Sequence, residues 1–203
     1  MLGRVHLITD SRPGRDPVEQ VRTLLPVATP DLVVQFRPAD EWSDRVVFEA
    51  ATEIVGLCRT KSVKVLINDR VHIAVAVDAD GAHVGADDLP VLAARRLLGP
   101  ERILGATARN AADAHAAMSK GADYVGVGPC YRSSSKQGLP ELLGPQGVAA
   151  IAPYARVIAI GGVTPERVPD LLSAGAHGVA VIAAVADAPD PAFALASLLD
   201  LVR

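Results

Sequence analysis

Polar residues follow several short apolar runs of this sequence, and their types suit the binding of a charged small molecule. Gln35, Phe36 and Arg37 end one such run, at residues 32–36. Because side chains alternate along a strand, Phe36 would lie under helices, and Gln35 and Arg37 would point the other way. A ligand phosphate would satisfy Arg37, and so would an aspartate of a neighbouring strand. We expect Gln35 and Arg37 to bind an anionic substrate.

Two acidic residues follow the next two apolar runs. Asp69 comes after Asn68 at the end of the run 63–67, and Asp88 follows the run 81–84. Carboxylates on adjacent strand ends are ligands that Mg²⁺ prefers, and water and phosphate complete its coordination. Both aspartates also precede apolar helical stretches, so each could instead be a helix N-cap. The spacing leaves metal binding and capping equally open.

A hydroxyl-rich, basic stretch at 131–138 follows the run 123–127. Its members Ser133, Ser135 and Lys136 have the hydroxyl and ammonium donors that suit a phosphate or a pyrophosphate. We expect these three residues to bind substrate.

Small residues end the last two apolar runs. Gly161 and Gly162 follow the run 157–160, and the run 178–182 ends at Ile182 and Ala183. Backbone N–H groups at two such neighbouring strand ends form a recurrent phosphate site in β/α barrels. Glycine allows the anion to approach the main chain closely. We expect a phosphate group at Gly162, Ile182 and Ala183.

Eight short apolar runs would position these residues. They are 5–9, 32–36, 63–67, 81–84, 102–105, 123–127, 157–160 and 178–182. Amphipathic helical patterns lie between them. Eight strands each followed by a helix predict a parallel sheet, and right-handed crossovers favour a closed (β/α)₈ TIM barrel over an open doubly wound sheet. We expect a single α/β domain over residues 1–203.

Composition excludes several classes of protein. The chain is 50% hydrophobic and 21% charged, with a net charge of −3, so it can bury a full core. Without a long basic run we expect no nucleic acid and no anionic membrane as partner. Without a leader pattern or an apolar stretch of spanning length we expect a cytoplasmic protein. The sequence allows a homo-oligomer without indicating one.

The order and spacing of these motifs resemble one family. The motifs are HLITD at 6–10, VQFR at 34–37, INDR at 67–70, ADGAHVG at 79–85, GADYVGVGP at 121–129, SK at 135–136 and AIGGV at 159–163. With these segments nearly the whole chain resembles the thiamine phosphate synthase family, which includes a related thiazole tautomerase. The resemblance implies a TIM barrel with a phosphorylated small molecule as substrate.

The resemblance also implies roles for single residues. Asp69 and Asp88 match the Mg²⁺ ligands of the synthase. Gln35, Arg37, Asn68 and Lys136 match groups that hold the pyrophosphate and the pyrimidine, and Thr107 stands where the family usually has a serine that contacts the pyrimidine. Gly162 and the backbone after the last strand match the cradle of a thiazole phosphate. The implied reaction joins an aminopyrimidine methyl pyrophosphate to a thiazole phosphate and releases pyrophosphate.

Four positions depart from the family's usual pattern. Ala39 replaces a lysine that binds pyrophosphate, Ala86 replaces a glutamine, and Ala183 replaces a serine; serines at 133–135 replace a threonine-rich stretch. Two alternatives therefore stay open: a metal-independent thiazole tautomerase, for which Cys130 is a candidate proton shuttle, and a relative that binds a thiazole phosphate without catalysis.

Overall fold

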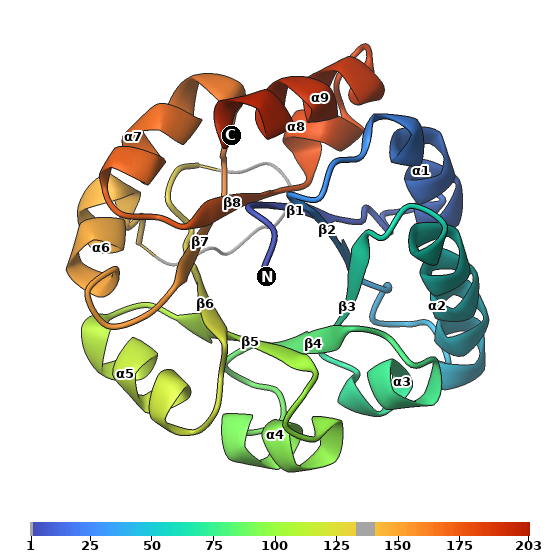
Figure 1. The fold of residues 1–203 in the computed structure, drawn as a ribbon, viewed down its shortest axis with the longest axis horizontal. Helices are drawn as coiled ribbons and strands as arrows, with labels where there is room; N and C mark the ends of the chain where they lie inside the picture. The colour runs from blue at the N-terminus through green and yellow to red at the C-terminus, as the bar shows by residue number, and fades with distance from the viewer. Residues whose placement is uncertain (1, 133–140) are drawn as a thin grey trace.

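A computed structural model describes residues 2–132 and 141–203, which form a closed barrel of eight parallel strands in sequence order (Figure 1). The strands are Val5–Ile8 (β1), Leu32–Phe36 (β2), Lys64–Asn68 (β3), Gly81–Val84 (β4), Ile103–Ala108 (β5), Tyr124–Val127 (β6), Val157–Ile160 (β7) and Gly178–Val181 (β8). The last strand pairs with the first, with Val5 opposite Val179. The predicted closed barrel is therefore confirmed, and the open sheet is excluded.

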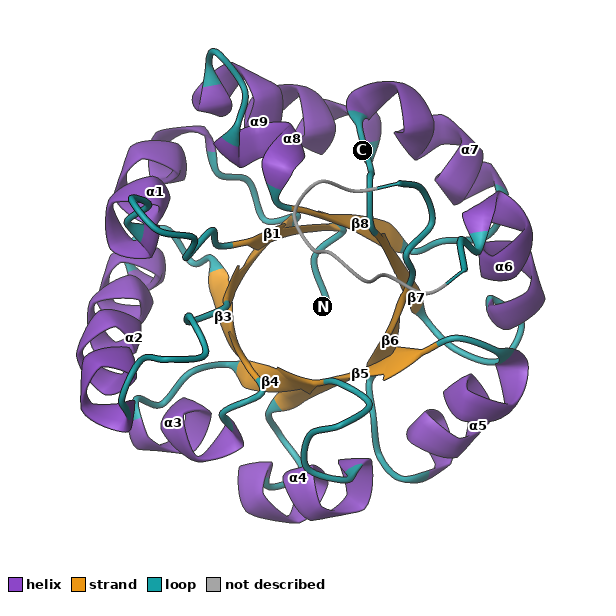
Figure 2. Ribbon diagram, turned by 180° about the vertical axis from the view of Figure 1, so that it is seen from behind, coloured by secondary structure: helices purple, strands orange, loops and turns teal. Residues whose placement is uncertain are grey.

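Helices surround the ring of strands on its outside, as Figures 1 and 2 show from the two ends of the barrel. They are Pro17–Leu24 (α1), Asp44–Arg59 (α2), Val71–Ala76 (α3), Val91–Leu98 (α4), Ala111–Ser119 (α5), Gly144–Ile151 (α6), Val168–Ser173 (α7), Ala183–Ala186 (α8) and Pro191–Leu201 (α9). Each strand is followed by a helix, as predicted, and β8 is followed by two. No helix within the described ranges is long and apolar enough to cross a membrane.

Strand alternation divides the buried side chains into two layers. Outward residues such as Val34 and Phe36 belong to the large core between strands and helices. Inward residues such as Val33, Leu66 and Ile158 form a smaller cluster inside the barrel. Because the strands are covered on both faces, their sequences read as nearly continuous apolar runs.

Two strands extend beyond their predicted limits, and both differences concern the proposed site. β3 is shifted by one residue and includes Asn68. β5 continues to Ala108, three residues beyond its predicted end, because its pairing with β6 extends to Ala108 opposite Val127. Thr107 therefore lies within a strand, where its backbone is fixed by the sheet.

Candidate active site

Gln35 and Arg37 take the orientation that strand alternation predicts. Phe36 is fully buried in the outer core. Gln35 lies inside the barrel with 4% exposure, and its Nε2 donates a long hydrogen bond of 3.5 Å to the Tyr124 hydroxyl. Arg37 lies just beyond the end of β2 and lines a pocket at the barrel mouth. Arg37 forms no ion pair with any residue that the structure describes, so the aspartate partner considered from the sequence is not found there.

Asp69 and Asp88 lie close enough for a hydrogen bond between their carboxyl groups. Burial and the neighbouring Asp88 raise the pKa of Asp69 well above its usual range, and the positive charge of Arg37 opposes this shift in part. The Asp69 N–H donates to the carbonyl of His83 at 2.8 Å, and the Asp69 backbone has φ 62°, in the left-handed region. Such a conformation is uncommon for a non-glycine residue and occurs often at functional sites.

Neither aspartate caps a helix. The N-cap of α3 is Arg70 and that of α4 is Pro90, and no side chain caps either helix. The Asp88 Oδ2 instead accepts the Gly85 N–H at 2.7 Å, within its own loop. The capping alternative is therefore wrong for both residues, because each carboxylate lies one or two positions before the cap.

Two neighbouring carboxyl groups could supply part of the coordination of Mg²⁺, which also binds water and substrate phosphates in proteins. Among the residues that the structure describes, no group of three or more His, Cys, Asp or Glu side chains could hold a metal by itself. Burial and the neighbouring Asp88 raise the pKa of Asp69, so a divalent cation between the two carboxyls would favour the charged form of both.

Asn68 and Thr107 lie on the inner face of the same part of the barrel. Asn68 is the last residue of β3 and lies opposite His83 of β4 in the register of the sheet. The Thr107 hydroxyl is 3.2 Å from His83 Nε2 and is exposed at the mouth. His83, which the sequence indicated only as a residue that could line the mouth, therefore sits between two predicted substrate-binding residues.

The glycines after β7 have a different structural role from the one the sequence suggested. Gly161 and Gly162 have φ of 92° and 62°. A Cβ at Gly161 would lie 2.7 Å from Pro129 Cα, and one at Gly162 would lie 2.2 Å from the Arg132 carbonyl oxygen. The space beside them is filled by the start of the loop after β6. Glycine is required there by backbone conformation and chain packing, and not by open space for an anion.

The main chain around these glycines can still bind an anion through its N–H groups. Gly162 and Val163 follow β7, and Ala183 and Ala184 begin α8 after β8. The N–H groups of these four residues donate no hydrogen bond to any described part of the chain. Ile182, the N-cap of α8, directly precedes Ala183 and also lines the mouth pocket. The predicted phosphate cradle therefore has N–H groups at both strand ends that have no partner among the described residues.

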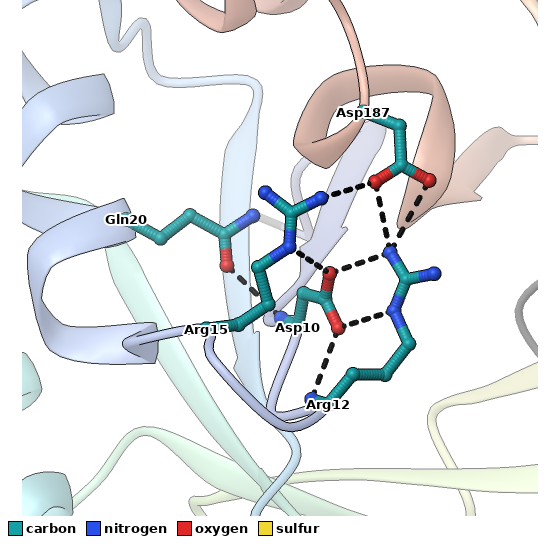
Figure 3. Close-up of polar contacts among 5 residues, drawn as sticks. All are labelled: Asp10, Arg12, Arg15, Gln20 and Asp187. Carbon is teal, nitrogen blue, oxygen red and sulfur yellow. Dashed lines mark hydrogen bonds and ion pairs between the residues drawn. The ribbon is translucent and has the colours of Figure 1, made fainter.

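A polar network at the mouth involves residues to which the sequence analysis gave no role (Figure 3). Asp10 follows β1 and is 4% exposed; its carboxylate accepts two hydrogen bonds from the Arg12 guanidinium, at 2.8 and 2.7 Å. Arg12 and Arg15 both also pair with Asp187, at 2.9 and 2.6 Å. Gln20 accepts the Asp10 N–H at 2.9 Å. The position of Asp10 directly after a strand was the signal that could have identified it.

The same loops enclose the mouth pocket, which has a volume of about 210 Å³. Its lining includes Arg12 from the loop after β1, Arg37 and Ala39 from the loop after β2, and Ile182 after β8. The pocket therefore joins the residue predicted to bind pyrophosphate to the edge of the phosphate cradle. Ala39, which replaces the family's usual lysine, gives this wall no charge.

Cys130 lies away from this chemistry. It is 1% exposed and belongs to the outer core, and burial raises the pKa of its thiol to about 11. Its sulfur lies 3.4 Å from the Val127 carbonyl oxygen. A buried, protonated thiol outside the barrel interior does not suit a proton shuttle to a ligand at the mouth.

Three predicted substrate-binding residues, Ser133, Ser135 and Lys136, lie outside the described residues. Their assignment therefore remains a prediction from the sequence.

Known proteins match this chain over nearly its full length. The sequence profile of the family described as thiamine monophosphate synthase matches residues 5–185. Proteins named thiamine-phosphate synthase from Salinispora arenicola and Salinispora tropica are 53% and 51% identical over 201 residues, which cover 98% of this chain and 97% of each relative. A solved thiamine phosphate pyrophosphorylase from Pyrococcus furiosus superposes with a TM-score of 0.86 and 31% identity, covering 98% of this chain and 95% of that one. The chain therefore belongs to the thiamine monophosphate synthase family.

Proposed function

We propose that this chain is a Mg²⁺-dependent transferase that joins an aminopyrimidine methyl pyrophosphate to a thiazole phosphate and releases pyrophosphate. Membership of the family supports the reaction. The placement of predicted site residues around one barrel mouth supports the assignment of substrates.

The observation that carries the proposal is the proximity of the Asp69 and Asp88 carboxyls, which follow β3 and β4, to each other and to the positive charge of Arg37. Two carboxylates that repel each other are stable when a cation is shared between them. Mg²⁺ bound there would neutralise negative charge that develops on the departing pyrophosphate. A metal-independent reaction gives no reason to hold two like charges together at this cost.

The chain's own residues would hold the two substrates at different ends of the mouth. Arg37 and Asn68 would hold the pyrophosphate, together with Lys136, Ser133 and Ser135 from the undescribed segment. Gln35, which is buried inside the barrel, and Thr107, which is exposed at its mouth, would hold the pyrimidine. The N–H groups of Gly162 and Ala183 would hold the thiazole phosphate.

These residues act by placing charge before the reaction begins. When pyrophosphate leaves, positive charge develops on the pyrimidine methylene and negative charge on the leaving group. Arg37 lines the mouth pocket and would stabilise that negative charge. The thiazole nitrogen then attacks the methylene carbon, so that a carbon–nitrogen bond replaces the broken carbon–oxygen bond and pyrophosphate keeps the electron pair of that bond. No side chain has to remove a proton in this sequence.

Neither Cys130 nor His83 suits the proton shuttle that the tautomerase alternative requires. Cys130 is buried in the outer core with its thiol protonated at neutral pH. His83 is the histidine nearest the mouth, and burial lowers its pKa to about 4. Its ring nitrogens face Tyr124 and Thr107, so neither is directed at a ligand.

The test is incubation of the purified chain with both substrates, with and without Mg²⁺, followed by product analysis by mass spectrometry. The proposal predicts thiamine phosphate and one equivalent of pyrophosphate only when both substrates and Mg²⁺ are present. Isomerisation of the thiazole phosphate alone in the presence of a chelator would refute the transferase assignment. The absence of any product with both substrates and Mg²⁺ would indicate a relative without this catalytic activity.

A further inference from the structure

A chain of polar contacts runs through the inside of the barrel below the mouth. Gln35 Nε2 lies 3.5 Å from the Tyr124 hydroxyl, and that hydroxyl lies 3.1 Å from His83 Nδ1. The other ring nitrogen of His83, Nε2, lies 3.2 Å from the Thr107 hydroxyl. Four strands, β2, β6, β4 and β5, contribute one residue each. These contacts therefore connect Gln35 and Thr107, which are assigned to the pyrimidine, through Tyr124 and His83, which have no assigned role.

Two glycines leave space inside the barrel for the rings of Tyr124 and His83. A Cβ at Gly105 would lie 2.2 Å from Tyr124 Cζ and 2.5 Å from His83 Nδ1. A Cβ at Gly126 would lie 3.0 Å from His83 Cε1. These glycines occur in the middle of strands, where glycine is otherwise unfavourable. The arrangement of Tyr124 and His83 is therefore built into the sequence of β5 and β6.

The orientation of the Gln35 amide, with Nε2 towards the Tyr124 hydroxyl, favours one direction for the hydrogen atoms of these contacts. A neutral imidazole has one N–H donor and one acceptor nitrogen. With Gln35 as donor to the Tyr124 oxygen, the Tyr124 hydroxyl can donate its proton to His83 Nδ1. In that arrangement His83 carries its own proton on Nε2 and donates it to the Thr107 oxygen. The Thr107 hydroxyl proton is left to point into the mouth, where Thr107 is exposed.

We propose that Tyr124 and His83 are positioning residues that fix Thr107 as a hydrogen-bond donor and leave the carbonyl oxygen of Gln35 as an acceptor. This pattern complements the edge of an aminopyrimidine, in which a ring nitrogen accepts and the adjacent amino group donates. The choice of an aminopyrimidine as the ligand rests on the proposed function, whereas the direction of the hydrogen bonds does not. If every donor were reversed, Thr107 would be an acceptor and Gln35 a donor, and the edge recognised would be that of an oxo-pyrimidine.

The direction is measured by the ¹⁵N chemical shifts of the histidine rings in the ligand-free protein. His83 signals are assigned by comparison with a His83→Asn sample, which lacks them. The proposal predicts a protonated Nε2 and an unprotonated Nδ1 at neutral pH. A ring with its proton on Nδ1 would overturn the proposal. This measurement does not depend on enzymatic activity, so it decides the direction even if the synthase reaction is not observed.

The effect of these contacts on binding of the pyrimidine substrate is measured with Tyr124→Phe, which keeps the ring and removes the hydroxyl. Loss of one buried hydrogen bond corresponds to a change of about 3–10-fold. We expect KM for the pyrimidine pyrophosphate to rise by about that factor while KM for the thiazole phosphate stays unchanged. Tyr154→Phe, at a side chain that is 53% exposed, removes the same atom outside the barrel and should change neither constant. Equal changes in both KM values for Tyr124→Phe, or no change in either, would reduce the pair to a structural role.

Discussion

At the scale of single residues, Asp69 and Asp88 place two carboxyl groups in contact where the fold alone gives no reason for them. Their capping role, which the sequence could not exclude, is absent because Arg70 and Pro90 occupy the cap positions. Spacing along the chain could place both residues at strand ends. It could not show that the left-handed backbone of Asp69 would bring its carboxyl to Asp88, because that contact depends on the path of two separate loops.

The pair makes a prediction about stability and pH. The unfolded pKa of an aspartate is about 3.9, and the folded pKa of Asp69 is raised by burial and by Asp88. A raised pKa means that this group destabilises the fold increasingly as pH rises above about 4. Asp88→Asn removes the repulsion but keeps an oxygen for the Gly85 N–H. The metal-free variant should therefore melt about 2–4 °C above the parent at pH 7, which corresponds to about 1 kcal/mol after allowance for solvent screening.

Calorimetric scans at pH 7 and at pH 4 measure this effect. The difference in Tm should shrink at pH 4, because the raised pKa of Asp69 means that its carboxyl takes up a proton in the folded state between pH 7 and pH 4. A variant that melts lower than the parent at pH 7 would contradict the account of the pair as two repelling charges.

Lys136 carries a second prediction at this scale, made from the sequence. Ala39 adds no positive charge to the pocket wall, and Arg12 of the same wall is already paired with Asp10 and Asp187. The pyrophosphate would therefore depend on Lys136 together with Arg37 and the metal. Lys136→Ala should lower kcat/KM by about 100-fold, as expected for loss of one preorganised charged donor. The measurement is steady-state release of pyrophosphate, with Lys120→Ala, an exposed lysine on another loop, as control. A loss of less than about tenfold would show that Lys136 does not assist departure of pyrophosphate.

At the scale of elements, the glycines after β7 show how strand ends and loops define the cradle. A Gly-Gly pair was visible in the sequence, and its place after the seventh strand was predicted correctly. The reason for the pair was not visible, because it lies in the approach of residues 129–132 from the preceding loop. Patterns within one segment cannot show which other segment packs against it.

Gly162→Ala tests this packing. A methyl group would meet the Arg132 carbonyl oxygen at 2.2 Å, so the loop after β6 or the cradle must move. We expect KM for the thiazole phosphate to rise by about tenfold or more, and stability to fall by more than the 1–2 kcal/mol that left-handed backbone costs alone.

The matched control is Gly14→Ala. Gly14 has φ of 82° but nothing within 4 Å of its Cβ position, so it reports only the cost of the backbone conformation. Equal losses of stability in the two variants, measured by urea denaturation, would argue against the packing account.

The network around Asp10 connects two elements that frame the mouth: the loop after β1 and the end of α8 (Figure 3). The Asp10 side chain is almost fully buried, and its hydrogen bonds with Arg12 hold the pKa of Asp10 below its usual range. A depressed pKa means that the stabilisation is present at neutral pH and is lost as pH falls through the acidic range. Asp10→Asn should therefore cost about 1.5–3 kcal/mol at pH 7, the usual contribution of a charged hydrogen bond.

Urea denaturation at pH 7 and pH 3 measures this contribution. The parent and the Asp10→Asn variant should approach each other in stability at the lower pH. A constant difference at both values would mean that the Asp10 charge does not hold the two elements together.

At the scale of the whole molecule, the barrel could be predicted because its eight strands alternate with helices and their number closes the sheet. The inner and outer layers followed from alternation around Phe36. The polar chain from Gln35 to Thr107 could not be predicted, since Tyr124 and His83 meet only after closure brings β6 and β4 to either side of β5. Sequence reasoning therefore finds strand-end residues better than it finds contacts across the barrel.

The central claim is that Asp69 and Asp88 bind the Mg²⁺ required for transfer. Its most direct test is pyrophosphate release as a function of Mg²⁺ concentration for the parent chain, Asp69→Asn and Asp87→Asn. Asp87 is an exposed neighbour of Asp88 in the same loop, so its variant controls for the loss of one negative charge. The account predicts that Asp87→Asn follows the parent, whereas Asp69→Asn needs at least about tenfold more Mg²⁺ for half-maximal rate. Identical Mg²⁺ dependence for all three proteins would contradict it.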